Sequence, residues 1–111
     1  MDENYKIPIS ITIDPNDVYK LLIRIPNGKV TTYGDIAKHL GNKKLARSVG
    51  KILHNNPNPI IVPCHKVVFS NGKIGGYAFG LKMKKNLLKK EGIIILKDGT
   101  IENFHKIRIE Y

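Results

Sequence analysis

The spacing of hydrophobic and polar residues predicts a chain of short helices separated by turns. Apolar residues recur at helical intervals within residues 14–25, 32–40, 45–54 and 82–91. Thr32 and Asp35 form an N-cap pair at the start of the second stretch, and the third follows after a short turn around 41–43. Two short helices joined in this way are typical of a helix-turn-helix, in which the later helix lies against nucleic acid.

Extended segments are expected beside these helices. Residues 9–13 alternate like a strand, 60–69 are apolar and β-branched, and 93–111 resemble a terminal hairpin, whereas the glycine-rich stretch 74–80 predicts a loop. The expected fold is mainly α with small β elements, a winged helix-turn-helix-like DNA-binding domain. A length of 111 residues without repeats or linkers predicts one domain over 1–111, with a short leader of about 1–15.

The charge balance favours a polyanionic partner. Lys and Arg number 19 against 9 Asp and Glu, which gives a net charge of +10. Such an excess suits nucleic acid, although a basic surface that only aids solubility gives the same balance. The third predicted helix has small and basic residues opposite its apolar stripe, which could admit a groove and contact its phosphates, or simply face solvent. These residues are Ala46, Arg47, Gly50, Lys51 and His54.

Sequence signals for a membrane or a metal are missing. No apolar run approaches the roughly 18 residues that span a bilayer, and the N-terminal residues lack the basic-then-apolar order of a signal peptide. The protein is therefore expected inside the cell, in the cytoplasm or with the DNA of a nucleoid or nucleus. One cysteine and four scattered histidines lack the paired spacing of metal ligands, so no metal is expected.

The single cysteine, Cys64, is either a buried packing residue or a reactive group, because it can form no internal disulfide. A thiol reacts as its thiolate, so a base must take the proton. His65 is the nearest base, but neighbouring side chains of an extended segment point to opposite faces, so a bridging water or a bend is needed. Glu91 falls on the apolar stripe of the last predicted helix. If it meets the His65 ring, it fixes the tautomer and raises the basicity.

The motif Pro63-Cys64-His65-Lys66-Val67 closely resembles the P-C-H-R-V active-site motif of the 6-O-alkylguanine-DNA alkyltransferases. Further segments resemble that family in the same order and at matching intervals: 25–30, 32–34, 46–50, 56–57, 75–77 and 91–92. The match covers roughly residues 16–92, nearly all of the family's C-terminal catalytic domain. The resemblance implies a DNA-repair protein that acts as a monomer, without a cofactor, on double-stranded DNA containing alkylated guanine.

The resemblance also implies a single-turnover mechanism. The damaged guanine rotates out of the duplex, and Cys64 takes the alkyl group from its six-position oxygen, with 4-O-alkylthymine as a second candidate lesion. The protein is consumed because the S-alkyl cysteine persists. By the family's pattern, His65 draws the Cys64 proton through a water and Glu91 orients His65. Tyr33 helps to rotate the nucleotide and can protonate the leaving guanine.

Other positions take their expected roles from the same pattern. Arg47 resembles the arginine that fills the gap left by the flipped base, and Asn56 the hinge asparagine that ties the recognition helix to the active-site turn. The carbonyls of Cys64 and Val67 would read the amino group of guanine. The other expected site residues are Thr32, Ala46, Gly50, Lys51 and His54 on the DNA side, and Pro63, Gly75, Gly76, Tyr77 and Ala78 around the base.

The chain departs from the family at several positions. Ala78 replaces a serine that donates to the guanine oxygen, so a backbone amide or Tyr33 would take over that bond. His54 replaces an arginine near DNA, and Lys66 replaces an arginine with the loss of its planar fork. Typical members carry an additional N-terminal domain, whereas a short leader precedes Val18 here. This predicts either a trimmed or a naturally minimal form.

Two other functions stay open. Alkyltransferase-like proteins share this short architecture and bind alkylated DNA without repairing it, flagging the damage for another pathway. They carry tryptophan at the cysteine position, and this chain contains no tryptophan. A winged-helix regulator that reads sequence in the major groove would explain the helix-turn-helix and the charge, but not Cys64 and His65 together with Glu91. A suicide alkyltransferase with a cysteine nucleophile is therefore the expected enzyme.

Overall fold

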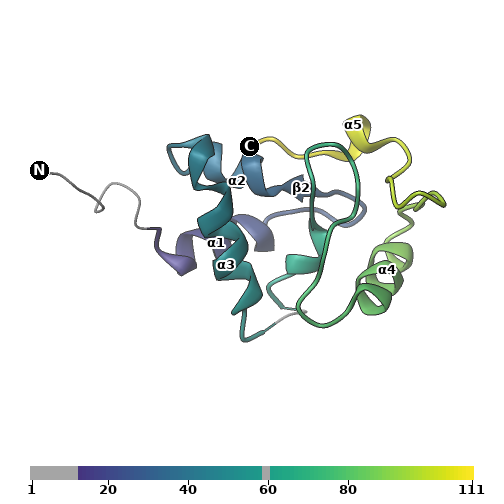
Figure 1. The fold of residues 1–111 in the computed structure, drawn as a ribbon, viewed down its shortest axis with the longest axis horizontal. Coiled ribbons are helices and arrows are strands. Elements are labelled where there is room, and N and C mark those ends of the chain that lie inside the picture. The colour runs from purple at the N-terminus through teal and green to yellow at the C-terminus, as the bar shows by residue number, and fades with distance from the viewer. Residues whose placement is uncertain (1–12, 59–60) are drawn as a thin grey trace, which may run out of the picture.

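A computed structural model describes residues 13–58 and 61–111 (Figure 1). The predicted strand over 9–13 lies, apart from Ile13, outside the described residues. The elements, with η for a 3-10 helix, are α1 (Pro15–Ile23), β2 (Thr31–Thr32), α2 (Tyr33–His39), η2 (Lys43–Leu45), α3 (Ala46–His54), η3 (Cys64–Lys66), β3 (Val67–Val68), α4 (Leu81–Lys90) and α5 (Phe104–Ile107). The predicted fold class, mainly helical with small β elements, is confirmed. In the described parts of the chain, no helix is long and apolar enough to cross a membrane.

The predicted helix starts are set by side-chain caps. Asp14 accepts a hydrogen bond from the Asn16 amide at 2.9 Å at the start of α1, and Thr32 accepts one from the Asp35 amide at 3.0 Å at the start of α2. In a full capping box the Asp35 side chain would also accept from the Thr32 amide. This bond does not form, because the Asp35 carboxylate binds Arg108 instead. This ion pair joins α2 to the C-terminal segment.

The helix-turn-helix comprises α2, η2 and α3. Asn42 caps η2 by accepting from the Lys44 amide at 2.9 Å, and Gly41 takes a φ of 122°, which favours glycine. The buried faces of both helices join α1 in one hydrophobic cluster. Figure 1 shows α1, α2 and α3 beside one another. Its members include Val18, Leu22, Ile36, Ala37, Val49, Leu53 and Cys64. The nucleophile candidate therefore packs in the same core as the helix-turn-helix.

A second hydrophobic cluster lies between the β elements, α4 and the C-terminal segment. Its buried members are Val30, Val68, Ile74, Leu88, Ile93, Ile101 and Phe104. The parallel pair of β2 and β3 aligns Thr31 with Val67 and Thr32 with Val68. This pairing places the start of α2 beside the strand that directly follows Cys64–Lys66.

Two sequence predictions of extended structure are only partly right. Within the predicted extended segment 60–69, Val67–Val68 is a strand, but Cys64–Lys66 is a 3-10 turn, closed by a 3.0 Å bond from the Lys66 amide to the Pro63 carbonyl. The expected terminal hairpin of 93–111 forms only over its first part. There Ile95 and Ile101 make an antiparallel bridge, the Leu96 amide donates to the Thr100 carbonyl at 2.8 Å and the Glu102 amide to the Ile94 carbonyl at 2.9 Å, whereas Phe104–Ile107 is the helix α5. The spacing of Phe104 and Ile107 fits a helical turn as well as it fits an irregular strand.

The chain ends alongside β2. The Val30 amide donates to the Ile107 carbonyl at 3.0 Å, and the Ile109 amide donates to the Val30 carbonyl at 2.7 Å. The Tyr111 hydroxyl donates to the Leu21 carbonyl at 2.6 Å. The C-terminal residues thus brace the segment that leads into the helix-turn-helix.

Candidate active site

A cavity of about 350 Å³ opens beside Cys64. Its walls come from α2, α3, the 3-10 turn and the glycine-rich loop, and consist of Tyr33, Gly50, Leu53, His54, Cys64, Gly76, Tyr77 and Ala78. Cys64 is only 5% exposed, so a reaction partner must enter the cavity to meet its thiol. The cavity lies within the 300–1,000 Å³ range that is typical of small-molecule sites.

The 3-10 turn decides how the residues after Cys64 are directed. Because the chain turns here, the side chains of His65 and Lys66 are both buried, at 5% and 3% exposure, instead of pointing to opposite faces. The expectation that His65 must point away from Cys64 assumed an extended segment, so it does not apply to this turn. Among the described residues, no direct hydrogen bond joins Cys64 to His65.

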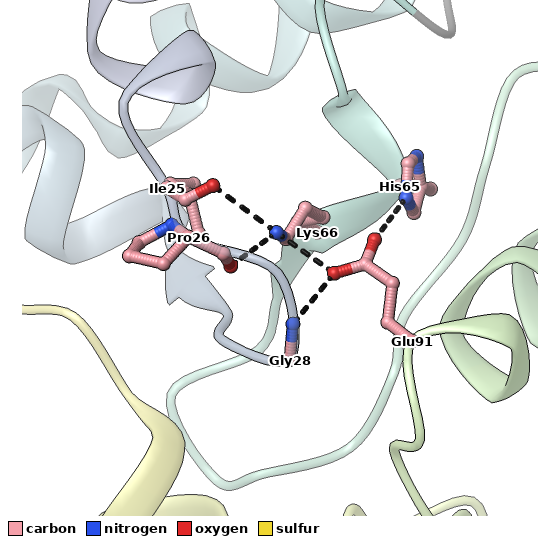
Figure 2. Close-up of polar contacts among 6 residues, drawn as sticks. All are labelled: Ile25, Pro26, Gly28, His65, Lys66 and Glu91. Carbon is pink, nitrogen blue, oxygen red and sulfur yellow. Dashed lines mark hydrogen bonds and ion pairs between the residues drawn. The ribbon is translucent and has the colours of Figure 1, made fainter.

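The imidazole of His65 pairs with the carboxylate of Glu91, as Figure 2 shows. The distance from His65 Nε2 to Glu91 Oε2 is 3.1 Å, and His65 Nδ1 is buried without a protein partner. An ionised carboxylate can only accept, so Nε2 carries the hydrogen and Nδ1 keeps its lone pair. Burial lowers the pKa of His65, and Glu91 opposes this shift. The neutral ring can therefore act as a base at Nδ1.

The second carboxylate oxygen of Glu91 is held by a separate set of donors (Figure 2). Oε1 accepts from Lys66 Nζ at 2.9 Å and from the Gly28 amide at 2.9 Å. Lys66 Nζ also donates to the carbonyls of Ile25, at 3.2 Å, and Pro26, at 2.6 Å. Burial acts to raise the pKa of Glu91, but the bonds from Lys66, Gly28 and His65 outweigh it and hold this pKa below its ordinary value. Glu91 is thus ionised and fixed in orientation.

Asn56 connects the end of α3 to the segment that leads into the Cys64–Lys66 turn. Its Nδ2 donates to the Val62 carbonyl at 2.8 Å, and its Oδ1 accepts from the Asn58 amide at 2.9 Å. The side chain is buried, with 4% of the residue exposed. The Cys64 amide in turn donates to the Val62 carbonyl at 2.8 Å. α3 and Cys64 are therefore linked through one carbonyl group.

Two tyrosines face the cavity. Burial raises the pKa of Tyr33, and burial raises the pKa of Tyr77 to about 12, with nearby Cys64 adding to both shifts. Both phenols therefore keep their protons at neutral pH. The hydroxyl of Tyr77 is buried and has no partner among the described residues. Each phenol is available to donate to a group bound beside Cys64.

The other expected site residues lie around this cavity. Arg47 and Lys51 are exposed on α3, Pro63 is half-buried beside the turn, and Val67 is buried behind it. Thr32 caps α2 and is buried. A second cavity next to the first is lined by Thr32, Ala46 and Tyr33, among others. Gly75 has a φ of +71° and packs under the ring of Phe69. The expected site residues thus fall into two sets: those that line the cavity beside Cys64, and Arg47 and Lys51, which are exposed on α3.

Sequence reasoning missed three residues of the site: Leu53, Lys66 and Lys84. Leu53 was placed only in the apolar stripe, yet it also lines the cavity. Lys66 was noted only as a replacement for arginine. Lys84 lies on the same helical stripe as Leu88 and Glu91, so the spacing that pointed Glu91 inward could also have found it.

A helix-turn-helix joined to a buried cysteine, histidine and carboxylate defines a DNA-associated domain with a candidate nucleophile. Residues 15–93 match the family model described as 6-O-methylguanine DNA methyltransferase, DNA binding domain. The chain belongs to this family, and the resemblance inferred from its motifs is confirmed.

Named relatives and solved structures agree with this family. Methylated-DNA–protein-cysteine methyltransferase of Methanosarcina acetivorans is 53% identical over 75 residues, covering 68% of this chain and 48% of the relative. S. pombe Atl1 in complex with damaged DNA containing O6-carboxymethylguanine has a TM-score of 0.72 at 32% identity, covering 86% of this chain and 93% of that one. Mycobacterium tuberculosis OGT in complex with DNA has a TM-score of 0.69 at 38% identity, covering 83% and 54%. The chain spans about half the length of the curated relatives it matches.

Proposed function

We propose that this protein repairs double-stranded DNA by moving the alkyl group of 6-O-alkylguanine to Cys64, in one irreversible turnover. The observation that carries the proposal is that Cys64 lines a cavity and that His65, the next residue, is paired with Glu91. A nucleophile, a neutral base and a group that orients the base are the parts that such a displacement requires.

The chemistry follows from the protonation states. His65 Nδ1 takes the Cys64 proton through a bridging water, and Glu91 stabilises the resulting imidazolium. The thiolate attacks the alkyl carbon, the sulfur–carbon bond forms, and the carbon–oxygen bond breaks with its electron pair on guanine. Tyr33, which is protonated at neutral pH, supplies a proton to the leaving guanine. No oxidant, metal or cofactor enters this balance.

The exposed face of α3 supports binding of the duplex. Arg47 and Lys51 are exposed there, on a chain whose net charge is +10. Flipping a base out of the stack costs a few kcal/mol, and we assign to Arg47, which is exposed on α3, the task of filling the gap. Because Asn56 links α3 to the Cys64 turn, the position of the duplex also sets the position of the flipped base.

Lesion binding without repair is the second candidate. It is favoured by the similarity to S. pombe Atl1, since the alignment covers 93% of that chain. Cys64 supports transfer instead, because the sequence offers a nucleophile at this position and contains no tryptophan.

The test is intact-protein mass spectrometry after incubation with a duplex that carries one 6-O-methylguanine, followed by peptide mapping. One added methyl on Cys64, saturating at one per chain, is expected. Cys64→Ala should bind the duplex and gain no mass. Tight binding by the wild-type protein without any mass change would replace transfer by lesion binding.

A further inference from the structure

Lys84 is a buried lysine that the proposed mechanism does not use. It lies in α4, and none of it is exposed. Its Nζ donates to the Val67 carbonyl at 2.8 Å and to the Gly76 carbonyl at 2.9 Å. Among the described residues, no carboxylate forms an ion pair with it. Burying an ammonium without a counter-ion costs free energy of folding. Lys84 is therefore expected to have a role that an apolar side chain could not fill.

The two carbonyls that Lys84 joins belong to two segments that meet at the cavity. Val67 directly follows the turn that carries Cys64, and Gly76 lines the cavity next to Tyr77 and Ala78. The Lys84 ammonium is therefore a bridge between the nucleophile turn and the glycine-rich loop.

The glycine-rich loop has few other fixed points. In the described structure, none of the amides of residues 75–79 donates a hydrogen bond to a backbone carbonyl. Gly75 packs under Phe69, and the Gly80 amide donates to the Tyr77 carbonyl at 3.1 Å. The bond from Lys84 to Gly76 thus ties down the middle of a segment that its own backbone does not hold.

We propose that Lys84 is a positioning residue that holds the loop of residues 75–78 against the Cys64 turn and so fixes the width of the lesion cavity. This inference rests on the proposed function of that cavity. Hydrogen bonds from a charged donor are roughly twice as strong as neutral ones, which suits a single side chain that secures a loop. A reactive carbon must sit close to and in line with the sulfur, so a wider cavity slows the displacement.

The charge state of Lys84 agrees with this role. Burial lowers its pKa to about 8, and the neighbouring Cys64 opposes the shift. The side chain is therefore mainly an ammonium at neutral pH, with the donors that both carbonyls require. The positive charge of Lys84 also lowers the pKa of His65, in addition to the larger effect of burial.

The test compares Lys84→Met, which removes the donors and keeps most of the volume, with Lys82→Met, which removes an exposed lysine of the same helix. Backbone NMR order parameters of residues 75–80 are measured on the free proteins. Transfer is measured in a single turnover from a duplex containing 6-O-methylguanine. For Lys84→Met we expect the order parameters in 75–80 to fall from about 0.85 to below about 0.6. The transfer half-time should lengthen about tenfold, with duplex affinity kept within about twofold. Lys82→Met should behave as wild type.

A conservative variant separates positioning from stability. Lys84→Arg keeps the charge and donors, so it should recover part of the loop order and of the transfer rate. If Lys84→Met does not fold, Lys84→Gln, which removes the charge, takes its place in both measurements. Wild-type order parameters in 75–80 of the uncharged variant would overturn the proposal, whatever the transfer rate. Lowered order parameters with an unchanged transfer rate would also overturn it. Absence of transfer by the wild-type protein would defeat the proposed function, while the order parameters would still decide whether Lys84 holds the loop.

Discussion

Lys66 donates to Glu91 Oε1 at 2.9 Å, on the opposite carboxylate oxygen from the one that pairs with His65. The lysine therefore neutralises and orients the group that orients the candidate base. Its positive charge also adds to the burial that lowers the pKa of His65. One side chain thus sets both the geometry and the basicity of the pair.

Replacing Lys66 by methionine should therefore shift the acidic side of the pH–rate profile of transfer to higher pH. His65 acts as a base when neutral, so the wild-type rate falls as the pH drops through a pKa that lies below the ordinary 6.5. In Lys66→Met, loss of the positive charge raises the His65 pKa, so the fall begins at higher pH. A looser Glu91 also slows transfer about tenfold at neutral pH. Single-turnover rates between acid and neutral pH measure both effects.

Lys66→Arg is the matched variant, because it keeps the charge and should keep the wild-type inflection. If Lys66→Met shows the wild-type pH profile, Lys66 does not tune the base.

The ion pair of Asp35 with Arg108 should contribute to stability. Arg108 donates from Nε and Nη2 to the two carboxylate oxygens at 2.8 Å each, and Asp35 is 5% exposed. Arg108→Ala leaves a buried carboxylate without its partner, so the free energy of unfolding should fall by about 2–4 kcal/mol. Urea denaturation measures this loss, with the exposed Arg24→Ala as the control. The double variant of Asp35 and Arg108, both to alanine, should be more stable than additivity predicts.

Two adjacent glycines of the cavity loop should respond differently to alanine. Gly75 has a φ of +71°, and a Cβ there would lie 3.1 Å from the Phe69 ring, so Gly75→Ala should cost about 1–3 kcal/mol. Gly76 has no heavy atom within 4 Å of its Cβ position, and its φ lies outside the left-handed region. Gly76→Ala should change stability by less than about 0.5 kcal/mol. Equal losses in thermal or urea unfolding would contradict this account of the loop.

The exposed Arg47 should matter for the duplex and not for the free base. Arg47→Ala should slow transfer from 6-O-methylguanine in a duplex by roughly tenfold or more, because the flipped state loses its filling side chain. Transfer from free 6-O-methylguanine needs only the cavity, to which Arg47 does not belong, and should keep its rate. Arg24→Ala serves as the control for charge. Equal slowing with both substrates would remove Arg47 from the flipping step.

Local patterns predicted the helices well because caps and apolar stripes are local features. Asp14 and Thr32 start their helices where the sequence indicated, and Glu91 points to His65 as its place on the α4 stripe suggested. The turn at Cys64–Lys66 was missed, since β-branched neighbours favour extension and only the surrounding contacts favour a turn.

Tertiary partners explain the remaining differences. Asp35 looked like the acidic half of a capping pair, but Arg108, far away in sequence, takes its carboxylate. Lys84 received no role from the sequence, and only its acceptors, Val67 and Gly76, explain its burial. Such contacts join residues that are far apart in the sequence, so the spacing of apolar residues within one segment cannot predict them.

The pairing of Ile107 and Ile109 with Val30 has a consequence for the order in which the protein is made. Synthesis runs from the N-terminus, so the helix-turn-helix leaves the ribosome before the residues that brace the edge leading into it. Until Ile109 is available, the polar groups of Val30 must bond to water and Asp35 lacks Arg108. The helix-turn-helix therefore reaches its final packing only after Arg108 and Ile109 have left the ribosome and closed the edge beside Val30.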